Sequence, residues 1–264
     1  MSTAKPSERI HKYLAQAGIA SRRQIESWIK AGRLTVNGKI AKPGDRITPE
    51  DKVRLDGELL HMGAPSEKTR ILAYHKPAGE VCTRSDEKGR PTVFAALPSI
   101  RNGRWVNIGR LDLNTTGLLL FTNDGALANR LMHPSGEIER EYAVRVFGEV
   151  GREVLKKMLE GVELEDGRAA FDSIHEAGGQ GRNHWYHVVL REGRNREVRR
   201  LWESQGISVS RLIRVRFGPC QLPRSLRPGA YHEFSKSEVN EFLNAVEIPA
   251  GRDNNATRSV KRKT

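Results

Sequence analysis

One carboxylate stands in a sequence context that suits chemistry. Asp112 lies in the segment Gly109–Gly117, among small polar residues and close to Arg110. The apolar run Leu118–Phe121 follows directly and predicts a buried strand that would hold this loop rigidly. A carboxylate on such a loop suits nucleophilic or acid–base work. An aspartate in an ordinary turn has the same local sequence, so this segment alone leaves both interpretations open.

A tyrosine could act on a nucleic-acid base. The alternation of residue types in Glu139–Val146 predicts a strand with Tyr142, Val144 and Val146 on one face. Tyr142 could stack on an extruded base and take part in proton transfer. It could equally be an ordinary core residue, which is the common place for an aromatic side chain.

Arginine is concentrated in the last third of the chain. Residues 191–216 contain eight Arg, three Glu and no Lys. A guanidinium forms bidentate pairs with phosphate and carboxylate groups, and an ammonium group does not. We therefore expect this segment, which includes Arg194, Arg196 and Arg199, to contact phosphate or to pair with Asp112.

Other chemistries lack their sequence signatures. The chain has no Gly-Lys-Ser/Thr phosphate loop and no Gly-x-Ser-x-Gly elbow. The histidines are scattered, and the two cysteines, Cys82 and Cys220, are far apart, which fits a reducing cytoplasm and argues against zinc. A calcium loop starting at Asp112 fails at Asn123, where a bidentate glutamate is required. We expect neither a metal nor a cofactor.

The overall charge indicates the kind of partner. Lys and Arg number 45 against 32 Asp and Glu, a net charge of +13 over 264 residues. A chain with this excess is drawn to polyanions, and nucleic acid is the first candidate. The N-terminus is polar through Arg9, and no apolar run approaches the roughly 20 residues that span a bilayer. We expect a cytoplasmic protein with no membrane contact.

Residues 1–60 are predicted to form a small unit of their own. Apolar residues at helical spacing predict two short helices, the first capped by Ser7 and the second by Ser21. The Asn37-Gly38 pair between apolar residues predicts a tight hairpin. Arg22 and Arg23 lie on the first turn of the second helix, off its apolar stripe, and we expect them to contact phosphates.

The remaining chain is predicted to hold one larger domain. Residues 61–69 are polar and aperiodic, which predicts a linker. Residues 70–247 show strand-like and helical stretches without regular alternation, and Gly178–Gly181 is predicted to be a hairpin loop. This pattern predicts an α+β fold with a mixed, mostly antiparallel sheet and flanking helices. Residues 248–264 are predicted to be a disordered basic tail.

Taken together, these segments resemble the RsuA/RluB family of ribosomal RNA pseudouridine synthases. The three catalytic motifs of that family resemble residues 109–125, residues 133–146, and residues 193–202 with 212–218. Residues 8–60 are similar to the alpha-L (S4-like) RNA-binding domain that precedes the catalytic domain in this family. The amino-acid sequence of Arg194–Glu203 is most similar to that found in the branch of the family that modifies large-subunit RNA.

The resemblance implies roles for individual residues. Asp112 matches the essential aspartate, which acts at the ribose by attacking C1′ or by taking a proton from C2′. Tyr142 matches the tyrosine that packs on the flipped base and helps to remove the C5 proton. Arg199 matches the basic partner of the aspartate, and Arg110 the residue that helps to hold the base out of its stack. Leu212 resembles the apolar floor of the uracil pocket.

The implied reaction is an isomerisation without a cofactor, and the implied partner is large-subunit ribosomal RNA, free or in an assembling particle. We expect a monomer. Two alternatives stay open: a small-subunit RNA pseudouridine synthase and a non-enzymatic ribosome-assembly factor that only binds RNA. The joint presence of Asp112, Tyr142 and Arg199 argues against the binding factor. A metal-dependent nuclease would need a second acid beside Asp112, and none is evident.

Overall fold

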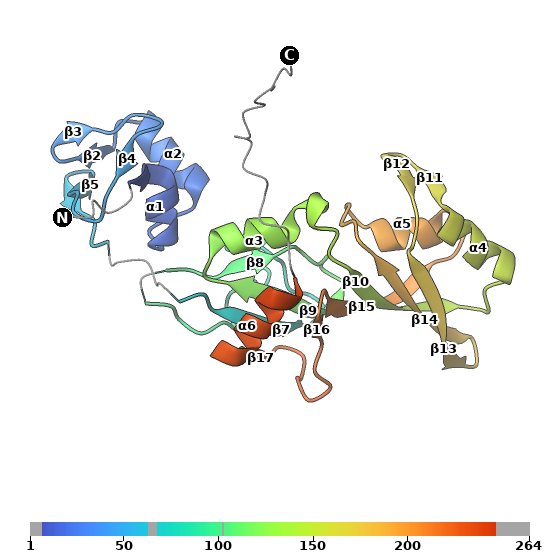
Figure 1. The fold of residues 1–264 in the computed structure, drawn as a ribbon. Helices are drawn as coiled ribbons and strands as arrows, with labels where there is room; N and C mark the ends of the chain where they lie inside the picture. Colours follow the sequence, from blue (N-terminus) through green and yellow to red (C-terminus); the bar gives the residue numbers. More distant parts are fainter. Residues whose placement is uncertain (1–6, 63–67, 102, 247–264) are drawn as a thin grey trace, which may run out of the picture.

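The computed structural model of this chain describes residues 7–62, 68–101 and 103–246. They form an N-terminal unit and a larger unit built on one long sheet (Figure 1). The predicted basic tail at residues 248–264 and the central part of the predicted linker, residues 63–67, lie outside the described residues.

Local sequence signals account for most of the N-terminal unit. Ser21 accepts the backbone N–H of Gln24 at 3.1 Å and caps the second helix as predicted. Asn37 and Gly38 both have positive φ, 50° and 83°, which gives the predicted hairpin its tight turn. The elements are β1 (Glu8–Arg9), α1 (Ile10–Gln16), α2 (Arg22–Lys30), β2 (Leu34–Val36), β3 (Lys39–Ile40), β4 (Arg46–Ile47), β5 (Val53–Leu55) and β6 (Glu58–Leu59).

The predicted cap of the first helix is wrong. Helix α1 begins after Arg9 and has no side-chain cap. The reason is a contact from far along the chain: β1 pairs antiparallel with β4, so residues 8 and 9 are extended. The Arg46 side chain donates hydrogen bonds to the Ser7 hydroxyl and carbonyl oxygens, which places Ser7 before a strand instead of at a helix start.

The larger unit confirms the α+β prediction with a mixed, mostly antiparallel sheet. Its main order is β13-β14-β10-β15-β9-β7-β17, with β8 on β9 and β16 on β15. Among its strands, as far as the structure describes the chain, only β15 and β9 pair in parallel. The strands are β7 (Ile71–Lys76), β8 (Val106–Ile108), β9 (Thr116–Thr122), β10 (Arg140–Phe147), β13 (Ser173–Gln180), β14 (Asn183–Leu190), β15 (Val209–Phe217), β16 (Cys220–Gln221) and β17 (Tyr231–Glu233). A separate hairpin pairs β11 (Val162–Leu164) with β12 (Gly167–Ala169).

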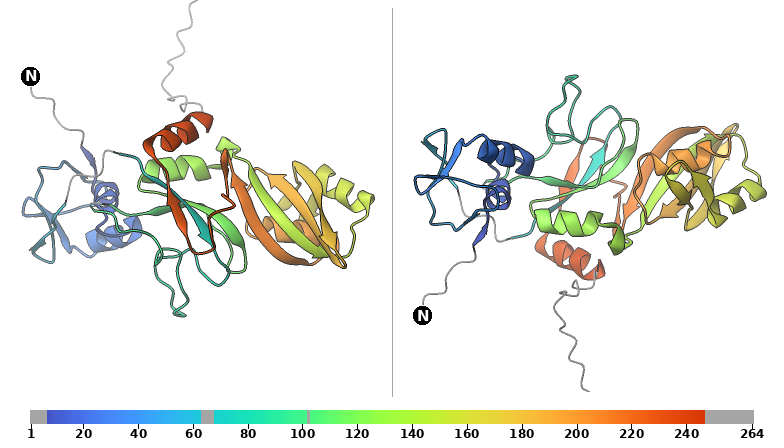
Figure 2. Two further views of the ribbon diagram at one scale, coloured as in Figure 1. Left: turned by 90° about the horizontal axis from the view of Figure 1, so that it is seen from below. Right: turned by 90° about the horizontal axis from the view of Figure 1, so that it is seen from above.

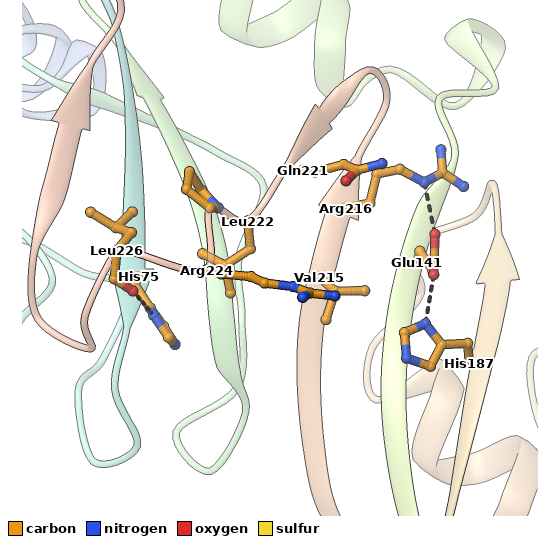
Figure 3. Close-up of a pocket in the computed structure, with 10 residues that line it drawn as sticks. His75, Glu141, His187, Val215, Arg216, Gln221, Leu222, Arg224 and Leu226 are labelled. Carbon is orange, nitrogen blue, oxygen red and sulfur yellow. Dashed lines mark hydrogen bonds and ion pairs between the residues drawn. The ribbon is translucent and has the colours of Figure 1, made fainter. Parts of the chain in front are cut away.

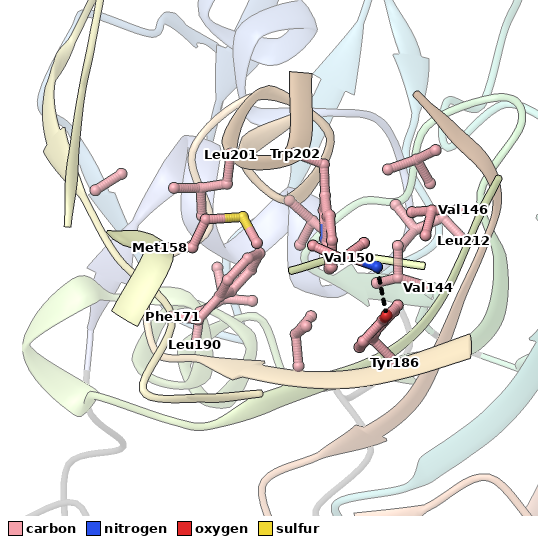
Figure 4. Close-up of a cluster of buried hydrophobic side chains, with 14 residues drawn as sticks. Val144, Val146, Val150, Met158, Phe171, Tyr186, Leu190, Leu201, Trp202 and Leu212 are labelled. Atoms are coloured by element: carbon pink, nitrogen blue, oxygen red, sulfur yellow. Dashed lines mark hydrogen bonds between the residues drawn. The ribbon is translucent and has the colours of Figure 1, made fainter. Parts of the chain in front are cut away.

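Helices cover different parts of this sheet. Helices α3 (Gly125–Met132, green) and α6 (Lys236–Ala245, red) lie side by side and share one apolar cluster with β7 and β9 (Figure 2). At the other end, α4 (Arg152–Glu160) and α5 (Glu197–Glu203) pack on β10, β14 and β15. Figure 4 shows Leu201 and Trp202 of α5 pointing into that second cluster. A short 3-10 helix, Pro134–Gly136, leads into β10.

The glycine-rich stretch near residue 180 differs from its prediction. Gly178 and Gly179 belong to strand β13, which is irregular there, and the chain turns only at residues 181 and 182. A side chain at Gly179 would collide with the Asn183 carbonyl oxygen at 2.1 Å, so the glycine permits close strand pairing.

Candidate active site

Asp112 lies on the loop between β8 and β9. The segment 76–79, which begins at the end of β7, holds the backbone of this loop by hydrogen bonds. Lys76, at the end of β7, is fully buried, and its ammonium group donates to the carbonyl oxygens of Leu113 at 3.3 Å and Thr115 at 3.0 Å. The Gly79 N–H also donates to the Leu113 carbonyl, at 2.9 Å. The backbone just after Asp112 is therefore held by two groups that come from outside the loop.

A thiol holds the backbone on the other side of Asp112. Cys82 donates its S–H to the Leu111 carbonyl at 3.3 Å, and its Sγ accepts the Leu111 N–H at 3.4 Å. Burial raises the pKa of this thiol, so it stays protonated and keeps its donor. Asp112, itself partly exposed, is thus presented from a loop that is anchored on both sides.

Arg199 reaches the same loop from α5. Its side chain is 9% exposed and donates to the carbonyl oxygens of Val209 at 2.9 Å and Asn114 at 3.4 Å. Burial lowers the pKa of Arg199, and the nearby Asp112 carboxylate acts in the opposite direction. The two side chains are close enough to interact electrostatically, but within the described residues Arg199 forms no ion pair. The expected pairing of Arg199 with Asp112 stays a prediction.

The register of the sheet carries Tyr142 and Leu212 to this loop. Tyr142 on β10 lies opposite Arg214 on β15, and Arg214 in turn lies opposite Gly117, at the start of β9. Tyr142 is partly buried and touches two apolar clusters, the one under α5 and the one around Trp105. Leu212 is 4% exposed in the first of these clusters. The β10–β15–β9 ladder therefore brings residues of all three predicted motifs together.

Sequence reasoning missed Lys76, Cys82 and Arg214. Arg214 is 2% exposed, donates from Nε to the Leu118 carbonyl at 2.7 Å, and has a buried Nη2 without a hydrogen-bond partner. For Lys76 one signal was available: it lies two residues after the apolar run Ile71–Tyr74, at the end of a predicted buried strand, where an unpaired charge is costly to bury. For Cys82 no comparable signal exists.

The predicted RNA-contacting arginines fall into two groups. Arg110, Arg22 and Arg23 are exposed and form no ion pair within the described residues. Arg194 instead donates to the carbonyl oxygens of Gly167 at 3.1 Å and Arg168 at 2.9 Å, and forms an ion pair with Glu192. Arg196 pairs with Glu203 at 3.4 Å. Their contacts with RNA remain predictions, and the structure favours the first group because the donors of the second are engaged.

No cluster of three or more His, Cys, Asp or Glu side chains placed to hold a metal ion occurs among the described residues. In the same part of the chain, no helix is both long and apolar enough to cross a bilayer.

The fold and the anchored aspartate define an RNA-modifying type of enzyme, with a small RNA-binding domain ahead of a mixed-sheet catalytic domain. Residues 8–53 match the model of the S4 domain, and residues 70–204 match that of RNA pseudouridylate synthase. The chain belongs to the RNA pseudouridylate synthase family. It is a pseudouridine synthase, an isomerase, as the resemblance implied.

Relatives make the match closer. The chain is 58% identical to ribosomal large subunit pseudouridine synthase B of Escherichia coli strain K12 over 246 residues. This alignment covers 92% of this chain and 84% of that protein. The chain is 53% identical over 274 residues to the protein of the same name from Yersinia pestis, covering 97% and 86%. A crystal structure of a pseudouridylate synthase aligns with a TM-score of 0.62 and 28% identity, over 89% of this chain and 99% of that one.

Proposed function

We propose that this enzyme converts one uridine of large-subunit ribosomal RNA into pseudouridine, with Asp112 acting at the ribose of a flipped nucleotide. The observation that carries the proposal is the anchored loop: Lys76 and Cys82 hold the backbone on both sides of Asp112, and the β10–β15–β9 ladder brings Tyr142 and Leu212 to the strand that follows this loop. The names of relatives that are more than half identical to this chain support the large-subunit RNA as substrate.

The reaction needs little more than positioning. The bond between N1 and C1′ breaks, the uracil turns, a bond forms between C5 and C1′, and the proton on C5 leaves while N1 gains one. Asp112 starts this sequence either by attacking C1′ or by taking the C2′ proton, and both routes suit a carboxylate on a fixed loop. Extruding the uridine costs a few kcal/mol, which contacts with the RNA backbone must offset.

The other residues take supporting roles in this proposal. Tyr142 packs on the flipped base and assists removal of the C5 proton, and Leu212 forms the apolar floor below it. Arg199 balances the charge of Asp112, and exposed Arg110 helps to keep the base out of its stack. Arg22 and Arg23 bind RNA phosphates from the N-terminal domain.

The division of the chain follows the same logic. We propose an RNA-binding domain at residues 1–60, a linker at 61–69, a catalytic domain at 70–247 and a basic tail at 248–264. A second domain on the same chain raises the effective concentration of the active site at the target stem. We propose that the enzyme acts as a monomer in the cytoplasm, on free RNA or on an assembling particle.

The decisive test compares wild type with Asp112→Asn on protein-free large- and small-subunit RNA transcripts, with pseudouridine mapped by carbodiimide treatment and primer extension. We expect one modified uridine in the large-subunit RNA. The variant should retain less than about a thousandth of the wild-type rate, because the amide can neither attack C1′ nor accept a proton. Substrate binding should be unchanged.

Modification of the small-subunit RNA alone would overturn the substrate assignment. If neither transcript is modified, the same assay is repeated on assembling large-subunit particles. No pseudouridine there either, with RNA binding intact, would contradict the proposed reaction.

A further inference from the structure

The N-terminal unit touches the catalytic unit at a narrow contact. The Arg104 guanidinium donates from Nη1 to the Ala20 carbonyl at 3.1 Å, two residues before α2 begins. Beside it, Gly18 approaches so closely that a side chain there would meet the Gly103 carbonyl oxygen at 2.6 Å. Gly18 also has a φ of 85°, so two independent reasons require glycine at this contact.

Three arginines gather along this contact, and we call Arg22, Arg84 and Arg104 the basic seam. Arg84 is exposed, lies over the Phe94 ring at 4.3 Å and donates to the Trp105 carbonyl oxygen. Arg104 is partly buried, and Arg22 is the exposed first residue of α2. Burial lowers the pKa of Arg104, and the charges of Arg84 and Arg22 lower it further, so each of these two lies close enough to Arg104 to repel it.

The seam lacks any acid that would balance it. Within the described residues, none of its three guanidinium groups forms an ion pair. The acids nearest in sequence lie elsewhere: Asp86 binds Arg90 at 2.6 Å, and Glu26, one turn after Arg22 on α2, forms no ion pair with Arg22 and lies 4.0 Å from the His11 ring nitrogen. Clustered like charges destabilise one another unless an anion binds between them. Carbonyl oxygens hold two of the guanidinium groups in place and leave other N–H donors free for such an anion.

The seam leads toward the active site. Arg84 follows two residues after Cys82, which contacts Leu111 beside Asp112. The path therefore runs from the start of α2, across Arg104 and Arg84, to the catalytic loop.

We propose that the basic seam binds the phosphate backbone of the RNA strand that carries the target uridine, so that both domains grip the same strand. This inference rests on the proposed function and adds the site at which the substrate crosses between the domains. It assigns Arg84 and Arg104 to binding, and neither to chemistry.

The test uses Arg84→Gln and Arg104→Gln in the full-length enzyme, with Arg152→Gln as matched control. Arg152 is an exposed arginine at the start of α4, at the far end of the catalytic domain, without an ion pair among described residues. A large-subunit RNA transcript is the ligand. Binding is measured at several salt concentrations, and single-turnover conversion at saturating RNA.

Each seam variant should weaken binding about fivefold to tenfold near 0.1 M salt, and should reduce the log–log salt slope by about 0.7 to 0.9, the value of one released counterion. Conversion at saturating RNA should stay within about twofold of wild type. Arg152→Gln should match wild type in both measurements.

Unchanged affinity and slope in both seam variants, with active wild type, would overturn the inference and leave the proposed function standing. An effect limited to Arg104→Gln with an unchanged slope would also overturn it, because loss of the Ala20 contact alone would explain that result. If wild type converts no uridine while the salt slopes still differ as expected, the proposed function fails and the seam remains an RNA-binding site.

Discussion

Two regions of the catalytic domain contain clustered cations, and the regions differ in whether these cations pair with acids. Around the Asp112 loop, Lys76, Arg199 and Arg214 are 0%, 9% and 2% exposed. Their hydrogen bonds go to backbone carbonyl oxygens, and none of them forms an ion pair among the described residues. Their positive charge is thus fixed in place without being neutralised.

On another part of the sheet, several cations pair with the acids Glu139 and Glu141. Glu141 lies between His187 at 2.7 Å and Arg216 at 2.8 Å (Figure 3). Arg216 also pairs with Glu139 at 3.1 Å, and Arg191 pairs with Glu139 at 2.8 Å. Burial by itself would raise the pKa of Glu141, but the bonds from His187 and Arg216 outweigh it, and the pKa is lowered. A groove of about 370 Å³ adjoins this network.

The difference separates structure from function. A paired network satisfies its own charges and needs nothing from outside. Burying an unpaired cation is unfavourable, and folds retain such groups mainly at sites that meet a negative charge during their work. The region around Asp112 therefore keeps positive charge that has no acidic partner among the described residues, which is the arrangement that our proposed function uses, whereas the Glu141 network joins strands β10, β14 and β15.

The largest effect on this arrangement should come from Gly117→Ala. Gly117 has a φ of 102°, and a side chain there would lie 2.2 Å from the Arg214 carbonyl oxygen, so the β9–β15 contact would have to open. We expect a loss of about 3 kcal/mol or more in the free energy of unfolding, measured by urea denaturation.

Gly167→Ala is the matched control, since Gly167 has a φ of 101° and nothing within 4 Å of the added carbon. This variant should lose only about 1 kcal/mol in the free energy of unfolding, because a positive φ is unfavourable for alanine but no contact has to open. Equal losses in the two variants would show that the strand contact at Gly117 is not tight.

How far the sequence predicts this molecule depends on the distance between the interacting residues. The Asn37-Gly38 turn and the Ser21 cap were predictable because their contacts lie within three residues. Asp112 was a candidate from its own loop, but that segment alone left an ordinary turn open, and only the resemblance to a family motif favoured the catalytic interpretation. The burial of Arg214 could not be predicted, because its side chain bonds the Leu118 carbonyl, 96 residues away in the sequence. The failed Ser7 cap has the same cause, a partner strand 39 residues further on.

The next prediction concerns Arg199, one of the buried cations around Asp112 that have no ion pair among the described residues. Arg199→Lys keeps the charge near Asp112, but one ammonium group cannot repeat the guanidinium contacts to Val209 and Asn114. We expect kcat to fall about tenfold to a hundredfold with KM within about threefold of wild type, in the pseudouridine assay. A rise in KM with unchanged kcat would instead assign Arg199 to RNA binding.

A buried acid on the same helix gives a smaller effect. Glu197 is 3% exposed, and burial raises its pKa to about 7, above an ordinary glutamate, although the Arg194 N–H acts against this. The folded protein then holds a proton that the unfolded chain releases between about pH 4.5 and 7, so stability falls as the pH rises through this window.

Glu197→Gln should remove this fall, which we expect to be on the order of 1 to 3 kcal/mol. Urea denaturation from pH 4.5 to 8 measures it. Glu153→Gln, an exposed acid in the first turn of α4, serves as control and should keep the wild-type pH profile. A Glu197→Gln profile parallel to wild type would contradict the raised pKa.

The smallest effect should come from the paired network, and it completes the comparison. Glu141→Gln removes one carboxylate that is partly exposed and shared between His187 and Arg216. Because the pKa of Glu141 is lowered in the folded protein, its contribution is present at neutral pH and disappears as the pH falls through the carboxyl range. We expect a loss of about 1 kcal/mol at pH 7 that shrinks toward zero in acid, with kcat unchanged. Urea denaturation at both pH values and the pseudouridine assay give these quantities. A fall in kcat as large as that of Arg199→Lys would erase the distinction between the two regions, because a paired network would then take part in catalysis.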